Sequence, residues 1–299
     1  MTFVLDPSLA PADPTMASPS WWGADSTRER GTLDGRPAFA KVHTLAAAAV
    51  LDLGSAFAAT SEAGRRGVGP TVLSADLATR TQVFEDLTDS HATGTLLDLE
   101  DRGRRADLAA ARRSTWDWRP EGVRTATVFD DVRALLARLA GTDAALPPEL
   151  GWMLRVLDDA ESRISGLGTG TAFIHGDSTS SNLMIPRTGP GVVLVDWDWA
   201  TFADPLQDVG SLLLELSFTP EEARSVFALV WGEHDDAAFA RAQLYRAAEA
   251  VRGGLVGTVM DHLDPGTAEY SKFADWMFLR ARIALGEPGF DDYLSGATR

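Results

Sequence analysis

The sequence contains no cysteine among its 299 residues. This absence excludes disulfide bonds, thiolate metal sites and thiol nucleophiles. The chain also lacks an apolar run of the roughly 18 residues that a membrane-spanning helix needs. Its first residues, rich in Pro, Ala and Asp, lack the basic start and apolar core of a signal peptide. We therefore expect a cytoplasmic protein that does not act within a membrane.

Basic residues are scarce relative to acidic ones, with 27 Lys and Arg against 43 Asp and Glu and a net charge of −16. A surface this acidic repels nucleic acid and anionic lipid, so we expect neither as a partner. It attracts cations, which favours a cationic substrate, although an acidic surface also simply keeps a protein soluble. The length and the hydrophobic content of 45% fit a globular protein with one large domain or two lobes.

The first part of the chain predicts a small antiparallel sheet that carries one helix. Asp34-Gly35 stands between two short extended runs, residues 30–33 and 36–42, and this pattern predicts a β-hairpin. The Ala- and Leu-rich run from Leu45 to about Ala63 predicts a helix. Residues 71–75 and 81–85 predict two further strands.

The rest of the chain is predicted to be mostly helical, because apolar residues recur there at helical spacing. The predicted helices cover residues 128–140, 147–167, 208–217, 220–231, 237–259 and 267–285. Two short strands, 172–174 and 192–195, frame a polar loop. The expected fold class is therefore α+β, with a β-rich lobe over residues 1–87 and a large helical lobe over residues 88–299.

The polar loop contains His175-Gly176-Asp177 and, five residues after the aspartate, Asn182. An apolar run then ends in Asp196-Trp197, and the segment Asp204-Pro205-Leu206-Gln207-Asp208 follows. This pattern suits phosphoryl transfer, in which one carboxylate orients a hydroxyl nucleophile. An amide oxygen and a second carboxylate then hold the magnesium ions that bridge the nucleotide phosphates.

The combination of these motifs resembles the aminoglycoside phosphotransferase and choline kinase superfamily, whose members are kinase-like enzymes that phosphorylate small molecules. The resemblance is dense over residues 171–216 and thinner over residues 36–87. A lone His-Gly-Asp would be a weak signal, whereas the three motifs in this order are specific. The resemblance implies a protein-kinase-like two-lobed fold and ATP and Mg²⁺ as cofactors.

Each motif residue has an expected role. Asp177 is the expected catalytic residue, which takes the proton of the substrate hydroxyl as the new P–O bond forms. Asn182 and Asp196 are the expected Mg²⁺ ligands, and two suffice because water and phosphate oxygens complete the shell. Taken singly, these residues also suit helix caps and loops. His175 and Asp208 are expected to organise the loop rather than to react.

Lys41 resembles the strand lysine that contacts the α- and β-phosphates, and strand alternation places Phe39 on the same face, beside adenine. No glycine-rich loop precedes the lysine, so residues 23–28 are expected to cover the phosphates. The family pairs this lysine with a helix glutamate that the sequence lacks at the usual position. Asp52 is the expected partner instead, with Glu62 or no ion pair as alternatives.

The segment Glu85-Asp86-Leu87 occupies the place of the connector between the lobes. Glu85 and Leu87 are therefore expected to offer backbone groups to adenine. Such contacts leave almost no side-chain pattern, so the sequence does not distinguish ATP from GTP.

The acceptor is expected to bind in the helical lobe, at Asp198, Trp199, Glu215 and Glu249. Carboxylates and aromatic rings suit an amine or a quaternary ammonium group, although each aromatic residue also suits a core position. The expected reaction is transfer of the γ-phosphate of ATP to a hydroxyl of a small cationic molecule. An aminoglycoside, an amino sugar or a choline-like alcohol would qualify, and the fold does not choose between them.

Two other functions are open. A catalytically weak, kinase-like regulatory protein that binds nucleotide fits the absent glycine loop, whereas retention of Lys41, Asp177, Asn182 and Asp196 favours an enzyme. A protein kinase is disfavoured by the His-Gly-Asp form, the missing Asp-Phe-Gly motif and the short first lobe.

Overall fold

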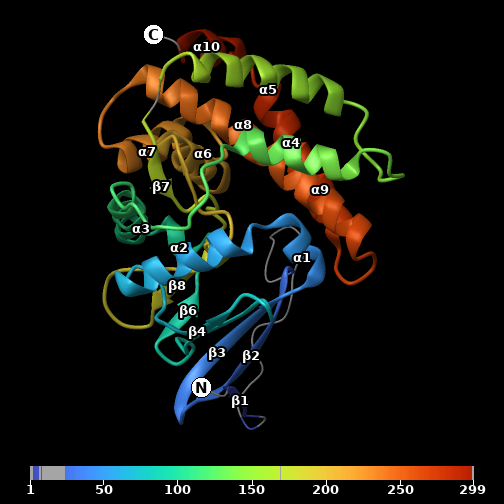
Figure 1. Ribbon diagram of the computed structural model, residues 1–299. Coiled ribbons are helices and arrows are strands. Elements are labelled where there is room, and N and C mark those ends of the chain that lie inside the picture. Colours follow the sequence, from blue (N-terminus) through green and yellow to red (C-terminus); the bar gives the residue numbers. More distant parts are fainter. Residues whose placement is uncertain (1–2, 7, 9–23, 169, 298–299) are drawn as a thin grey trace.

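A computed structural model describes residues 3–6, 8, 24–168 and 170–297. The chain forms a small lobe with an antiparallel sheet and a large lobe made mostly of helices (Figure 1). The predicted α+β, two-lobed fold class is therefore confirmed. Among the described residues, the longest helices carry too many polar and charged side chains to cross a bilayer.

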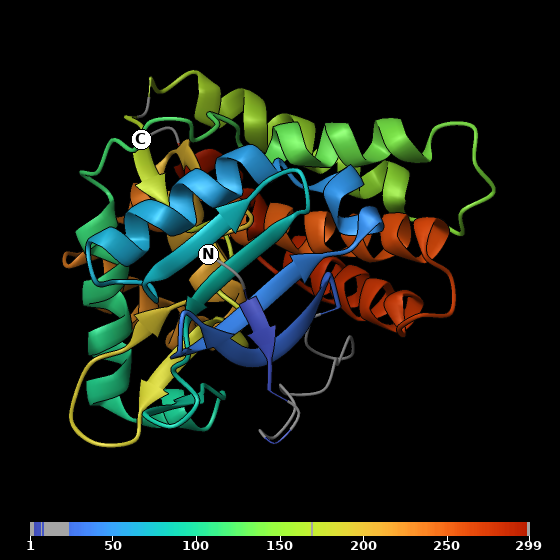
Figure 2. The same ribbon diagram turned by 60° about the horizontal axis from the view of Figure 1, so that its bottom comes forward.

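The small lobe is built on a five-stranded antiparallel sheet with the order β1-β2-β3-β5-β4, which faces the reader in Figure 2. The strands are β1 (Phe3–Leu5), β2 (Ser26–Leu33), β3 (Arg36–His43), β4 (Val72–Asp76) and β5 (Thr81–Glu85). The predicted hairpin is confirmed as β2 and β3, in which Leu33 pairs with Arg36. Asp34 and Gly35 have positive φ values of 51° and 77°, as the tight turns between twisted strands require.

Two helices replace the single helix predicted over residues 45–63, which is a correction. They are α1 (Leu45–Val50) and α2 (Leu53–Arg65). Leu51 between them is extended, and the carboxylate of Asp52 caps α2 by accepting a hydrogen bond from the Ser55 N–H at 3.0 Å. The Ala-rich composition conceals this break, because high helix propensity on both sides outweighs one capping aspartate.

The large lobe contains seven longer helices and one short helix among its described residues. They are α3 (Arg102–Thr115), α4 (Val128–Leu139), α5 (Leu150–Ser165), α6 (Pro205–Leu216), α7 (Pro220–Trp231), α8 (Asp236–Leu263), α9 (Tyr270–Leu285) and α10 (Phe290–Gly296). All six predicted helices are present within a few residues. Helices α3 and α10 were not predicted, because α3 is rich in arginine and α10 is only 7 residues long.

Short strands and turns of the large lobe frame the polar loop. Strand β7 (Ala172–Ile174) pairs with β10 (Thr201–Ala203), and β8 (Leu183–Pro186) pairs with both β6 (His91–Thr93) and β9 (Val193–Leu194). Two 3₁₀ turns complete the lobe, η1 (Asp98–Glu100) and η2 (Ser180–Asn182). The loop with the His-Gly-Asp motif therefore lies between paired strands that fix both of its ends.

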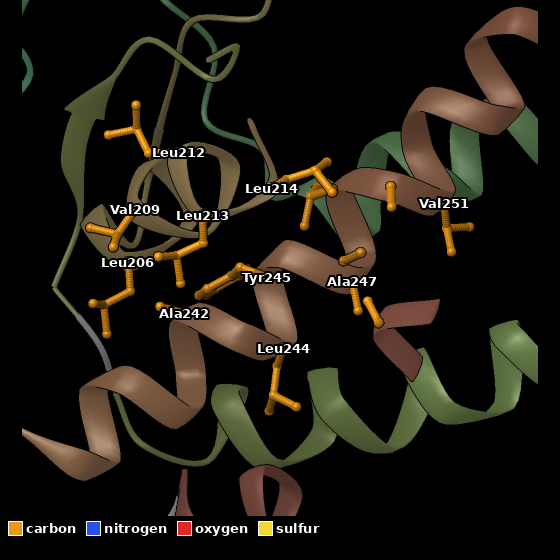
Figure 3. Packing of buried hydrophobic residues seen from close by; sticks show 14 of the residues in the cluster. Leu206, Val209, Leu212, Leu213, Leu214, Ala242, Leu244, Tyr245, Ala247 and Val251 are labelled. Atoms are coloured by element: carbon orange, nitrogen blue, oxygen red, sulfur yellow. The ribbon is translucent and has the colours of Figure 1, made fainter. Parts of the chain in front are cut away.

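Helix α8 runs through the centre of the large lobe, where α4, α6, α9 and α10 pack against it. Figure 3 shows the interface in which Leu206, Val209 and Leu213 of α6 lie beside Ala242 and Tyr245 of α8. Gly210 permits this approach, because a Cβ there would lie 2.6 Å from the Tyr245 Cβ and 2.7 Å from the Ala242 carbonyl oxygen. The two helices thus meet almost backbone to backbone, which sets the position of their polar residues.

We expect Gly210→Ala to lower the free energy of unfolding by about 1–3 kcal/mol, because the added methyl group overpacks this contact. Chemical denaturation followed by circular dichroism measures the change. The control is Gly151→Ala on α5, where the nearest atom to an added Cβ is 3.7 Å away and alanine should stabilise the helix by up to about 1 kcal/mol. Equal effects of the two substitutions would contradict the tight α6–α8 contact.

Candidate active site

The loop between β7 and β8 holds Asp177 in a fixed orientation. Gly176 has a φ of 77°, and a Cβ there would lie 2.3 Å from the Trp199 carbonyl oxygen, so only glycine fits. The Oδ1 atom of Asp177 accepts hydrogen bonds from the backbone N–H and the hydroxyl of Thr179, at 2.9 and 2.7 Å. The carboxylate is therefore held by its own loop.

Two buried arginines from distant helices hold the backbone of this loop. Arg112 of α3 donates to the Asp177 carbonyl at 2.5 Å and pairs with Asp208 at 3.1 Å. Arg252 of α8 donates to the Gly176 carbonyl at 2.7 Å. Asp208 also accepts a hydrogen bond from the Gly176 N–H at 3.2 Å, which is the contact expected from the sequence. Neither arginine was predicted, because no sequence pattern distinguishes a buried arginine from an exposed one.

His175 is a buried connector between the two halves of the motif. Its Nε2 donates to the Val195 carbonyl at 3.0 Å, and Val195 directly precedes Asp196. Burial, together with the nearby charge of Arg112, lowers the pKa of His175 well below its ordinary value. The ring is thus neutral and suits the structural role that we expected for it.

Lys41 of β3 lies among three carboxylates. Its Nζ is 2.8 Å from Asp198, 2.9 Å from Asp196 and 3.8 Å from Asp25. Burial opposes the charged form, but the three negative charges raise the pKa of Lys41 well above its ordinary value. Asp198 also contacts the Nε2 of buried His43 at 2.8 Å. Although burial opposes its ionisation, Lys41 and His43 hold the pKa of Asp198 well below its usual range.

The three carboxylates fit a divalent cation. Oxygen atoms of Asp25, Asp196 and Asp198 lie within 4.8 Å of one another. Burial raises the pKa of Asp196 well above its ordinary value, and the neighbouring carboxylates add to this rise while Lys41 opposes it. One lysine therefore leaves the cluster with excess negative charge, which a hard cation with oxygen ligands would neutralise. Asp196 also has a φ of 64°, a strained value of the kind that is common at functional sites.

The prediction that Asp52 pairs with Lys41 is wrong, because Lys41 contacts Asp25, Asp196 and Asp198 instead. Asp52 caps α2 through Ser55 and makes no ion pair with Lys41 in the described part of the chain. The break at Leu51 turns that carboxylate toward the start of its own helix. The alternative, Glu62, pairs with Arg65 and Arg66.

The prediction that Asp198 binds the acceptor is also corrected, because Asp198 lies beside Lys41 in the first cavity. Trp197 between Asp196 and Asp198 is fully buried in the core, so the two carboxylates point together toward Lys41. The sequence does not signal this placement, because residues 196–198 lie outside any strand and Asp196 has a φ of 64°.

The first cavity, about 420 Å³ in volume, contains the nucleotide and metal candidates. Its lining includes Phe39, Lys41, Glu85, Leu87, Asn182 and Asp196. Within the segment expected to cover the phosphates, Asp25, Ser26 and Arg28 line this cavity, whereas Gly23 lies outside the described residues.

In the connector between the lobes, the Glu85 carboxylate accepts a hydrogen bond from the Thr71 N–H at 2.7 Å, and the Leu87 carbonyl accepts one from the His91 N–H at 2.8 Å.

The second cavity, about 200 Å³, contains Asp177 and the remaining acceptor candidates Trp199, Glu215 and Glu249. Residues 177–182, which we call the dividing loop, line both cavities. Asp177 to Ser180 face the second cavity, and Ser181 and Asn182 face the first. Likewise, Asp198 lines the first cavity and the next residue, Trp199, lines the second. One continuous wall thus separates a lysine- and carboxylate-lined cavity from a cavity that contains Asp177.

Comparison with known families agrees with this arrangement. The model of the phosphotransferase enzyme family matches residues 19–252, which is most of the chain. The chain belongs to this family. The predicted family and the predicted enzyme class, a small-molecule phosphotransferase, are therefore confirmed. No curated protein matches the chain by sequence.

Solved structures of similar fold include a choline/ethanolamine kinase family protein from Mesorhizobium loti, with a TM-score of 0.76, 21% identity and coverage of 91% of this chain and 89% of that one. Choline kinase LicA from Streptococcus pneumoniae has a TM-score of 0.72 and 14% identity, over 87% of this chain and 90% of its own. A thermostable mutant of aminoglycoside phosphotransferase APH(4)-Ia has a TM-score of 0.58 and 16% identity, over 92% of each chain. At these identities the likeness concerns the fold.

For this phosphotransferase-family chain we expect Arg112→Met to lower the free energy of unfolding by about 3–5 kcal/mol, because Asp208 would stay buried without its counter-charge. Denaturant titration measures the loss. Arg102→Met is the control, because Arg102 lies at an exposed position of the same helix, and this substitution should change stability by no more than about 0.5 kcal/mol. Similar small losses in both variants would show that Arg112 does not support the loop.

Proposed function

We propose that this enzyme transfers the γ-phosphate of ATP, in the presence of Mg²⁺, to a hydroxyl group of a small amine-bearing molecule. The observation that carries the proposal is the dividing loop, which presents Asn182 to the first cavity and Asp177 to the second. A phosphate bound in the first cavity and a hydroxyl bound in the second would meet at this wall. Such positioning supplies much of the catalytic effect in phosphoryl transfer.

In the proposed reaction Asp177 accepts a hydrogen bond from the acceptor hydroxyl and takes its proton as the P–O bond forms. Thr179 fixes the carboxylate for this task. Lys41 donates to the nucleotide phosphates. Asp196 and Asn182, with Asp25 beside them, would hold Mg²⁺, which when bound neutralises phosphate charge.

Support for an adenine nucleotide comes from the shape and lining of the first cavity. Its apolar part includes Phe39, Phe84, Leu87 and Met184, which suit a flat base. LicA, whose fold is similar, has been solved in complex with AMP. We place the lobe boundary at residue 87, since β6 directly afterwards pairs with β8 of the large lobe. An ATP-dependent enzyme of this kind would act in the cytoplasm.

Support for an amine comes from charge. The second cavity contains the three carboxylates of Asp177, Glu215 and Glu249 against the two guanidinium groups of Arg252 and Arg280, and the whole chain has a net charge of −16. Enzymes of similar fold are named as kinases of choline and ethanolamine and as aminoglycoside phosphotransferases. The same surface charge disfavours nucleic acid as a partner.

A regulatory, catalytically weak nucleotide-binding protein is the second candidate. The observation in its favour is that, among the described residues, Lys41 pairs with Asp25, Asp196 and Asp198, none of which lies in a helix. Asp198 and His43 nevertheless give the lysine a fixed, buried environment, which favours the enzyme.

We expect Asp177→Asn to reduce acceptor-dependent ADP release by about 10²–10⁴-fold, because the amide cannot take the hydroxyl proton. The stabilisation by ATP and Mg²⁺ in a thermal shift assay should persist. Asp143→Asn, at an exposed position, is the control and should retain parental turnover. Near-parental turnover in Asp177→Asn would remove the catalytic role and favour the regulatory candidate.

We expect Asp196→Asn to abolish the thermal stabilisation by ATP and Mg²⁺. At a ligand concentration about 100 times the dissociation constant, this stabilisation amounts to about 2.7 kcal/mol. The unliganded protein should not lose stability, because the substitution removes one charge from a crowded acidic cluster. Asp52→Asn, outside the cluster, should keep the shift. An unchanged shift in Asp196→Asn would exclude it from the metal site.

A further inference from the structure

The three carboxylates of the second cavity differ in what they already contact. Asp177 is held by Thr179 and serves as the proposed base. Glu215 accepts a hydrogen bond from the Ser180 N–H at 2.8 Å, and its other oxygen lies 4.0 Å from the guanidinium of Arg280. Asp177 and Glu215 are therefore both oriented by groups of the dividing loop, whereas Glu249 lies on α8, outside that loop.

Glu249 is fixed on one side and unsatisfied on the other. Its Oε2 lies 2.5 Å from Arg252, which in turn is anchored to the Gly176 carbonyl at 2.7 Å and to Asp131 at 3.4 Å. Its Oε1 is buried and has no hydrogen-bond partner among the residues that the structure describes. The residue is 3% exposed and lines the cavity. A buried polar atom left unpaired is costly, and a donor on a bound acceptor molecule would satisfy it.

The two tryptophan rings of this cavity already lie beside cations of the protein. Arg252 lies 4.4 Å and Arg124 5.5 Å from the Trp199 ring centroid. Arg280 lies 6.0 Å from the Trp276 ring centroid. A quaternary ammonium has no N–H and depends on aromatic faces, so at either tryptophan it would share the ring with a guanidinium group of the same charge. The other aromatic side chains that line the cavity are Phe218 and Phe273.

We infer that Glu249 accepts a hydrogen bond from an ammonium N–H of the acceptor, so that the enzyme selects primary, secondary or tertiary amines over quaternary ammonium alcohols. This inference rests on the proposed function, because it needs an amine-bearing hydroxyl compound beside Asp177. A site built to pair with an N–H rejects an analogue that lacks it, since the protein group is then left unpaired.

The burial of Glu249 and the charges around it make the affinity for an amine depend on pH. Burial raises its pKa to about 8, the charges of Asp131, Asp177 and Asp208 add to this, and Arg252 opposes it. The remaining charged groups that line the cavity are Glu215 of α6 and Arg280 of α9. Glu249 in the empty site therefore holds a proton more readily than an ordinary glutamate does. An ammonium favours its ionised form, so binding releases a proton and tightens as the pH rises from 6 to 8.

A graded methylation series tests the inference. Ethanolamine, N-methylethanolamine, N,N-dimethylethanolamine and choline lose one N–H at each step, and glucosamine and kanamycin extend the panel to larger amines. We measure ADP release and the thermal shift with ATP and Mg²⁺ present. We expect kcat/KM to persist while one N–H remains and to fall at least about tenfold at choline.

Glu249→Gln tests the residue itself. The Gln oxygen can still accept from Arg252, which leaves an amide N–H₂ toward the cavity and turns an acceptor into a donor. We expect KM for N–H amines to rise at least about tenfold and the difference from choline to disappear. The control is the exposed Glu233→Gln, and an unchanged ATP–Mg²⁺ thermal shift confirms that Glu249→Gln is folded.

The outcomes separate the two proposals. Choline used as well as the N–H amines, or unchanged KM values in Glu249→Gln, would overturn the inference and leave the proposed function standing. If no amine of the panel releases ADP or shifts the unfolding temperature at millimolar concentration, both the amine substrate and the inference are wrong.

Discussion

One buried lysine surrounded by three carboxylates is the interaction on which the site depends. Lys41 belongs to the small lobe, whereas Asp196 and Asp198 belong to the large one. Buried charges persist only when they are paired, so these contacts fix β3 relative to the strand end that carries Asp196. His43 gives Asp198 a second partner. The position of the nucleotide cavity relative to the dividing loop therefore follows from charge balance as well as from packing.

The parts of the fold that the sequence predicts are those with a local cause. The Asp-Gly turn marks the hairpin, helical spacing marks α4 to α9, and the motif marks the dividing loop. The contacts of Arg112 and Arg252 have no such local cause. Arg112 pairs with Asp208, which is 96 residues away in the sequence, and Arg252 donates to Gly176, which is 76 residues away. Asp52 and Asp198 were misplaced for a related reason. A carboxylate looks the same in sequence whether it caps a helix, pairs with a lysine or faces an acceptor.

In the proposed enzyme the first cavity binds the nucleotide and the second binds the acceptor. The wall between them is anchored at its start, where Arg252 and Arg112 hold the carbonyl groups of Gly176 and Asp177. The side of the second cavity away from this wall is formed by side chains of α8 and α9, including Glu249, Trp276 and Arg280. Substitution of Trp276 there would alter which molecule fits while leaving the hydrogen bonds of Arg112 and Arg252 to the loop in place. A family with one reaction and many acceptors is consistent with that division.

The burial of Lys41 has a practical consequence for chemical labelling. The sequence has two lysines, and the other, Lys272 on α9, is exposed beside Glu269. Acylating reagents attack the neutral amine, and Lys41 is buried, held by three carboxylates and has a raised pKa. Coupling of a dye or a surface through lysine side chains would therefore be directed to Lys272, with the nucleotide cavity left unmodified.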